Sequence, residues 1–202
     1  MITYKTYLIN NQAEYLRNKP VDALQTIFRY EGCESLCDFC LNAVCDDPKA
    51  LFESPNFISL DQDLIILFLK MNELEIEEIK IWEFTLKWAL ARMSTQHNVN
   101  NLSHWTSSDF EELEKILHDL IPHIRWFQIP AKLFWRKINP FEQIFPKQLY
   151  KDIIGYHFDP DTPPINAVLP LRRNLSINSV LINRDHLSII ASWIDKKEKS
   201  FL

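Results

Sequence analysis

Apolar residues recur every three to four positions along most of the chain, which is the spacing of an amphipathic helix. The stretch 57–92 carries this pattern most fully. It predicts a short apolar helix over 64–69, then an acidic break, then a longer helix that contains Trp82 and Trp88. Along the longer helix we expect a buried stripe made of Ile76, Ile79, Trp82, Leu86 and Ala89. A helical pattern of this kind is typical of protein-interaction scaffolds rather than of catalysts.

The acidic break covers 72–78 and is rich in glutamate. We expect Glu75, Glu77 and Glu78 to occupy the first turn of the longer helix, because the helix dipole favours carboxylates there. Adjacent residues on a helix point to different sides, so Glu77 and Glu78 are not arranged as a cooperating acid–base pair. The sequence therefore predicts that these two carboxylates lie on a solvated helix face.

The same period predicts helices on both sides of this stretch. Proline is favoured in the first turn of a helix, because its missing N–H has no partner there in any case. The predicted helices comprise one that starts near Pro20, one over about 33–46, a short one from Pro48, one over 109–120 capped by Ser107 or Ser108, and one over 147–157. Between them we expect a long loop over 93–107. The chain is therefore predicted to be all-α.

Glycine is scarce, since the chain has only Gly32 and Gly155. Phosphate-binding loops need several glycines for close approach of the backbone, so dinucleotide and P-loop sites are excluded. Neither Asn-Gly nor Asp-Gly occurs, which argues against tight β-hairpins. Residues 158–175 carry four prolines and no helical period, so we interpret them as a linker after a helical domain over 1–157. Beyond it, 179–182 could form a strand and 184–194 a helix.

The formal net charge is −5, which argues against nucleic acid as the main partner. The charge is uneven, because residues 170–202 hold six Lys/Arg and three Asp/Glu, whereas the rest of the chain is acidic. No apolar run approaches the roughly 18 to 20 residues needed to cross a bilayer. The first residues lack the basic flank and apolar core of a secretory signal. We therefore expect the cytoplasm or the nucleus, with no membrane span.

Four cysteines lie close together, at Cys33, Cys37, Cys40 and Cys45. Their spacing does not match the paired units of common zinc sites. The first three share one helix face, where free cysteine usually packs as a small apolar residue. Core packing is the favoured interpretation, while a metal or redox switch and a disulfide stay open. The six histidines show no metal-ligand spacing, and we expect them on the surface or in loops. No catalytic, cofactor or metal site is predicted.

The segment 124–137 interleaves aromatic and basic residues. Such a segment could form a platform for single-stranded nucleic acid, although the acidic charge of the rest of the chain weakens that idea. We expect Phe134 and one tryptophan to fill the core instead. A protein-binding patch is the next alternative, since Trp and Arg are favoured interface anchors.

Three passages together resemble the BACK domain of the BTB–BACK–Kelch adaptor proteins. They read ALQTIFRYEGCESLCDFCLNAVCDD, SPNFISLDQDLIILFLKMNELEIEEIKIWEFTLKWA and LIPHIRWFQIPAKLF, in that order over about residues 1–140. In the family pattern, Phe57 enters the Leu-rich helix, Trp88 lies on the next helix, and Arg125–Trp126 follows. The passage SVLINRDHLSIIASWI resembles the opening of a TLDc domain, so 176–202 would be the start of one.

The resemblance implies a BACK-like array of stacked antiparallel helix pairs. It also implies a non-catalytic adaptor that joins a substrate protein to a cullin-type ubiquitin ligase. Cullin contact would use a BTB domain, expected upstream, together with a groove in the opening helices lined by Tyr7, Leu8, Tyr15 and Leu16. Homodimers would form through BTB. The BTB domain and most of TLDc are absent from these 202 residues, so we interpret the chain as a fragment or a truncated gene product.

Two other hypotheses remain. The first is a structural spacer of a TLDc-type protein that acts in oxidation resistance or proton-pump regulation, without a ubiquitin role; it rests on residues 165–202. The other is an enzyme or RNA-binding protein, which rests only on the cysteine cluster and the segment 124–137. In every case the identity of the partner or substrate is left open by the sequence.

Overall fold

The computed structural model describes residues 20–28, 34–95, 97–99, 101–159, 161, 163–166 and 168–172. Throughout these residues the regular structure is helical, with no strand. The α-helices are α2 (Pro20–Phe28), α3 (Glu34–Asp46), α4 (Pro48–Phe52), α5 (Gln62–Lys70), α6 (Glu78–Leu90), α7 (Ser107–Leu117), α8 (Ala131–Lys137) and α9 (Lys147–Phe158). Short 3-10 helices cover Pro55–Ser59, Leu102–His104, Ile121–His123, Trp126–Gln128 and Asn139–Ile144. The all-α prediction is confirmed for this part of the chain.

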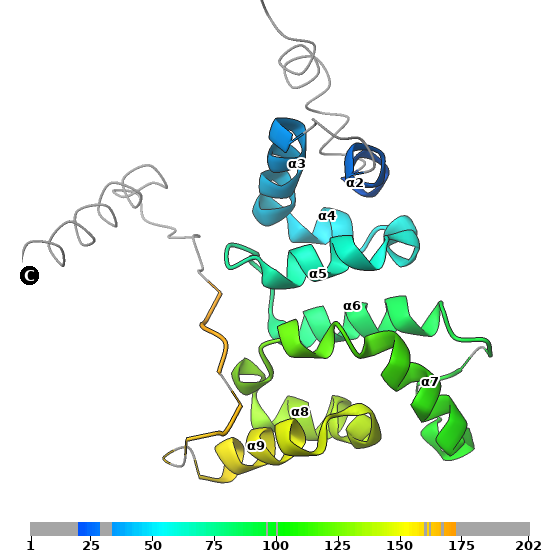
Figure 1. Cartoon of the computed structure of the whole chain (residues 1–202), viewed down its shortest axis with the longest axis vertical. Coiled ribbons are helices and arrows are strands. Elements are labelled where there is room, and N and C mark those ends of the chain that lie inside the picture. The colour runs from blue at the N-terminus through cyan, green and yellow to red at the C-terminus, as the bar shows by residue number, and fades with distance from the viewer. Residues whose placement is uncertain are drawn as a thin grey trace, which may run out of the picture.

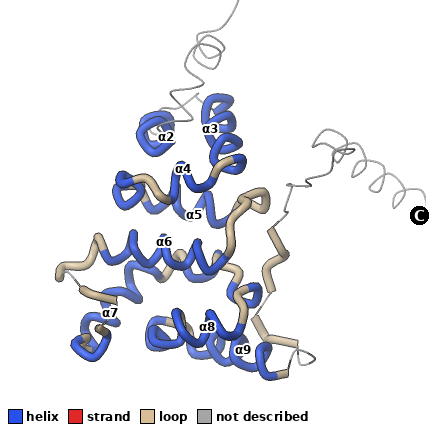
Figure 2. Tube along the Cα trace, turned by 180° about the vertical axis from the view of Figure 1, so that it is seen from behind, coloured by secondary structure: helices blue, strands red, loops and turns tan. Residues whose placement is uncertain are grey.

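The helices lie in successive layers along the long axis of the molecule (Figure 1). The pair α2 and α3 forms one end, α4 and α5 follow, α6 crosses the middle, and α8 with α9 forms the other end. The view from behind gives the same order, with α7 beside α6 (Figure 2). Each layer is amphipathic and can bury its apolar side only against its neighbours, which places a continuous core along the stack.

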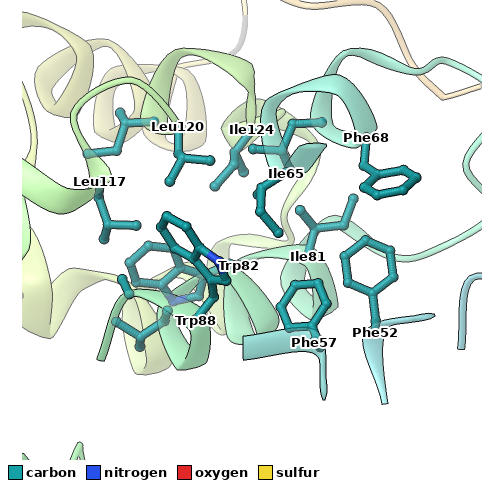
Figure 3. Close-up of a cluster of buried hydrophobic side chains, with 14 of the residues drawn as sticks. Phe52, Phe57, Ile65, Phe68, Ile81, Trp82, Trp88, Leu117, Leu120 and Ile124 are labelled. Atoms are coloured by element: carbon teal, nitrogen blue, oxygen red, sulfur yellow. The ribbon is translucent and has the colours of Figure 1, made fainter. Parts of the chain in front are cut away.

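Both tryptophans of α6 belong to this core, as predicted, with 1% of each exposed. They lie among aliphatic and aromatic side chains from the neighbouring layers (Figure 3). Each indole N–H has a backbone partner: Trp82 donates to the Lys137 carbonyl at 3.3 Å, and Trp88 donates to the Leu60 carbonyl at 2.8 Å. The ring of Trp82 also meets that of Trp126 edge-on, with centroids 5.4 Å apart. A buried tryptophan with a satisfied N–H contributes packing without the cost of an unpaired polar group.

The start of α6 differs from the prediction. The helix begins at Glu78 with Glu77 at its N-cap, so Glu75 and Ile76 precede it. Ile79, Trp82, Leu86 and Ala89 are buried as expected, whereas Ile76 is only half-buried. The glutamates therefore do not share one helical turn, because Glu77 is extended and the helix starts only after it.

The start of α7 also differs, because Thr106 and not Ser107 or Ser108 is its N-cap. The Thr106 hydroxyl accepts the Asp109 N–H at 3.3 Å, and the Asp109 carboxylate accepts the Thr106 N–H at 2.7 Å. This reciprocal pair is a capping box, which satisfies two backbone donors at once. The helix ends at Leu117, three residues earlier than predicted, and a 3-10 turn at Ile121–His123 follows.

Candidate functional site

The predicted partner-binding residues Tyr7, Leu8, Tyr15 and Leu16 lie outside the described residues, as do Cys33 and the TLDc-like residues 176–202. The strongest candidate within the described part is therefore the aromatic–basic segment 124–137. The structure divides this segment between two places. Its start is buried beside α6, and its second half forms α8 at the end of the stack.

At the start of the segment, Arg125 is inside the protein, with 3% of its side chain exposed. Its backbone N–H donates to Glu78 Oε2 at 3.2 Å, and its Nη1 lies 3.6 Å from Glu78 Oε1. Its Nη2 donates to Asn72 Oδ1 at 2.6 Å. Arg125 therefore ties the 3-10 turn before α8 to the acidic break, which precedes α6.

A second arginine, Arg172, contacts the same carboxylate although it lies 94 residues after Glu78 in the chain. Its Nε donates to Glu78 Oε1 at 2.5 Å. Its Nη2 donates to the Leu69 carbonyl at 3.2 Å, and its Nη1 donates to the Met71 carbonyl. These carbonyls belong to the C-terminal end of α5, where the last backbone acceptors have no partner within the helix. Arg172 therefore caps α5 and pairs with the first residue of α6 at the same time.

We call Glu78, Arg125 and Arg172 the ion triad. The side chains of Glu78 and Arg172 are 5% and 6% exposed, so all three charges are largely removed from water. Burial is the main cause that lowers the pKa of Arg125, and the neighbouring Arg172 cation lowers it further. Two cations share one carboxylate, and Arg125 Nε and Nη1 make no hydrogen bond within the described residues. Removing that carboxylate would leave two buried, unpaired charges, which is a large cost.

The ion triad corrects one sequence prediction. Glu78 was expected on a solvated face but is 7% exposed, whereas Glu77 is exposed as expected. The difference arises because Glu78 has cationic partners from distant parts of the chain, which helix periodicity does not reveal. Next to the triad lies a hollow of about 640 Å³, lined by residues of the acidic break and of α8, and by Leu171 and Arg172.

The described residues of the predicted linker also contact the helices. The Asp152 carboxylate on α9 accepts the Asn166 backbone N–H at 2.7 Å and its side-chain amide at 2.6 Å. The Gln128 side chain donates to the Leu169 carbonyl at 3.1 Å. With Arg172, these contacts hold 163–166 and 168–172 along the side of the stack, where Figure 1 draws them in orange. None of the residues 163–166 and 168–172 is helical, as the prolines predicted, whereas Phe158, predicted as the first residue of the linker, is the last residue of α9.

The second half of the aromatic–basic segment 124–137 lines a groove between α8 and α9. Phe134 is 1% exposed, whereas its neighbour Trp135 is 61% exposed. On α9, Phe158 is 83% exposed. The groove has a volume of about 350 Å³ and is mostly apolar, and it is lined by Ala131, Lys132, Phe134, Trp135, Arg136, Ile154, His157 and Phe158. We call it the α8–α9 groove. The expectation that Phe134 and one tryptophan, here Trp126, fill the core is confirmed.

The two cations beside the groove, Lys132 and Arg136, differ from the next lysine, Lys137, in their ion pairing. Lys137 forms an ion pair with Glu83 on α6. Within the described residues no ion pair involves Lys132 or Arg136, and both side chains are exposed. They are four residues apart on α8, so they project from the same face. The groove thus has an apolar floor and a basic edge.

The three described cysteines lie on α3, and their burial agrees with the predicted core packing. Cys40 and Cys45 are buried and Cys37 is half-buried. Burial, with a smaller effect of Cys37, raises the pKa of Cys40 to about 11. A thiol with such a pKa stays protonated near neutral pH and is a poor nucleophile. Within the described residues, no group of three His, Cys, Asp or Glu side chains is arranged to hold a metal ion.

Sequence reasoning missed Arg172 and the pairing of Asp152 with Asn166. Each depends on residues far apart in the chain, and an arginine among prolines gives no signal of its own. The exposed Trp135 had a usable signal. Within α8, Phe134 and Trp135 are adjacent, so a helix can bury only one of them on a given face.

No family model, curated protein or solved structure matches the chain. No helix in the described ranges combines the length and apolar character needed to span a bilayer.

Proposed function

We propose that the chain is a non-catalytic protein-interaction scaffold, the BACK-like module of a substrate adaptor for a cullin-type ubiquitin ligase. One observation carries the proposal. Two of the passages that resemble the BACK domain pack against each other, through Arg125 on Glu78 and through Trp126 on Trp82. The residues that carry the resemblance are therefore also residues that hold the layers together.

A stiff stack suits such a role, because an adaptor must hold its partners at a fixed separation. Each layer is fixed by buried apolar faces and by indole hydrogen bonds to the next segment. In this proposal the opening helices, with Tyr7, Leu8, Tyr15 and Leu16, contribute to the cullin contact together with a BTB domain. A substrate protein would be held further along the chain.

The experiment is capture of the tagged natural protein from its own cells, followed by detection of a co-purifying cullin. The test variant replaces Tyr7, Leu8, Tyr15 and Leu16 with alanine. We expect cullin with the unaltered protein and much less with the variant. If the unaltered protein captures no cullin, the adaptor proposal is wrong. If the variant captures as much as the unaltered protein, the adaptor role stands and the assignment of these four residues fails.

A second candidate is a spacer for a TLDc-type domain without a ubiquitin role. It is favoured by Arg172, whose bonds to α5 and α6 fix the point from which the chain continues toward 176–202. A spacer with a fixed exit point would set the orientation of whatever follows. This candidate predicts that the captured protein brings down proton-pump subunits and no cullin.

A further inference from the structure

The α8–α9 groove is not used by the proposed cullin contact and lies at the other end of the stack from α2 (Figure 1). Its rims, Trp135 and Phe158, are among the most exposed large apolar side chains of the described residues. Exposed apolar groups that cluster around a concave floor are typical of interaction sites. Tryptophan is also a preferred anchor residue in protein interfaces.

The floor of the groove can accept an apolar side chain. A volume of about 350 Å³ is at the lower end of the range for ligand pockets, which suits one bulky side chain rather than a cofactor. Phe134 and Ile154 supply apolar surface. His157 also lines it, and burial lowers the pKa of its ring, which favours the neutral form. Its Nε2 has no hydrogen-bond partner within the described residues.

The charges around the groove select the partner. Lys132 and Arg136 lie on the α8 side, and the exposed Lys151 lies on α9 three residues before Ile154. Residues three or four apart share a helix face, so Lys151 extends the basic edge along α9. A complementary partner is acidic, because matched charges guide association and set specificity.

We propose that the α8–α9 groove binds an acidic peptide segment of another protein, with one bulky apolar side chain in the floor and Asp or Glu beside it. The segment 173–202 of this chain is a poorer occupant, since it holds five Lys/Arg and three Asp/Glu and is itself basic. Single-stranded nucleic acid is also less suited. Trp126 is buried and Trp135 is the remaining tryptophan of segment 124–137, so a row of stacking rings is lacking. The proposal does not depend on the cullin-adaptor role.

The test selects dodecapeptides from a random displayed library on the immobilised 202-residue chain. Selected peptides are then synthesised with a fluorescent label and titrated by anisotropy. We expect them to carry Leu, Ile, Phe or Trp flanked by Asp and Glu, and to bind more weakly as salt is raised, because salt screens exposed charges. Binding in the micromolar range is expected for so small a contact.

Two variants locate the binding site. Trp135→Ser removes the aromatic rim and should weaken binding about 10-fold or more, as for other interface anchors. The double variant Lys132→Glu with Arg136→Glu should weaken it about 10-fold and shift selection toward basic peptides. Its matched control is Lys87→Glu with Lys115→Glu, which changes the net charge equally at exposed sites on α6 and α7. The control should change affinity by less than about 2-fold. Unchanged melting of all variants establishes that they fold.

Several results would overturn the proposal. The proposal fails if the selection does not enrich peptides with an apolar residue flanked by Asp and Glu. It also fails if the Trp135→Ser variant binds the selected peptides as tightly as the unaltered chain. Competition by oligothymidylate would indicate nucleic acid instead, and competition by a synthetic peptide of residues 176–197 would indicate the chain's own segment. A dimer that dissociates in the Trp135→Ser variant would make the groove a contact between copies of this chain.

Discussion

Replacing Glu78 with alanine should destabilise the protein more than any other single glutamate substitution on α6. The substitution leaves Arg125 and Arg172 with 3% and 6% of their side chains exposed and no carboxylate between them. Breaking a buried ion pair from one side costs about 3–5 kcal/mol. Against a total stability of about 5–15 kcal/mol, this loss would move the unfolding transition far toward lower denaturant.

The assay is urea unfolding followed by far-ultraviolet circular dichroism. Glu77→Ala is the matched control, since Glu77 precedes Glu78 but is exposed, and its effect should be within about 0.5 kcal/mol. Arg172→Met keeps the Arg125 contacts of Glu78 and should cost about 1–3 kcal/mol through the lost charged hydrogen bonds.

A double-mutant cycle between Glu78 and Arg172 measures their coupling free energy directly. Residues in direct contact within one salt-bridge network typically couple by about 0.5–3 kcal/mol. Because Arg172 Nε lies 2.5 Å from Glu78 Oε1, we expect a coupling in the upper half of this range. Equal effects of Glu78→Ala and Glu77→Ala, or strictly additive effects of Glu78→Ala and Arg172→Met, would refute the ion triad.

Further predictions concern the core and the buried thiol. Trp82→Ala and Trp88→Ala should each cost about 3–5 kcal/mol in urea unfolding, while Trp135→Ala stays within about 0.5 kcal/mol; similar losses at all three would contradict their assigned burial. The raised pKa of Cys40, about 11, means that the folded state keeps this proton when the unfolded state has lost it. Its contribution to stability is thus complete below about pH 9 and is lost between about pH 9 and 11. Cys40→Ala should flatten this alkaline decline, and an unchanged decline would count against the burial of the thiol.

Much of the helical pattern could be predicted from the sequence, because each helix is encoded locally. The apolar period of 57–92 and the prolines at Pro20 and Pro48 place their helices without knowledge of tertiary contacts. Helix starts were less secure. Thr106 was missed as the cap of α7 because its partner is Asp109, and only the pair identifies a capping box.

The candidate site depended on contacts that no local pattern encodes. The sequence gives no reason for Arg172 to meet Glu78 rather than solvent, since 94 residues separate them. Burial of a glutamate is unfavourable by default, so the general expectation of exposure was reasonable for Glu77 and wrong for Glu78. In the segment 124–137, composition identified the aromatic residues, and the adjacency of Phe134 and Trp135 indicates that α8 buries one of them on a given face, but only packing decides which.

The most direct test of the proposed adaptor role is titration calorimetry of the purified natural protein with the N-terminal helical region of a cullin. Binding should be saturable and should weaken at least about 10-fold when Tyr7 and Leu8 are both replaced by alanine, in line with loss of interface anchors. Trp135→Ala, at the other end of the stack, should leave the affinity unchanged. Absence of heat of binding at any cullin concentration tested, confirmed by gel filtration of the mixture, would contradict the adaptor role.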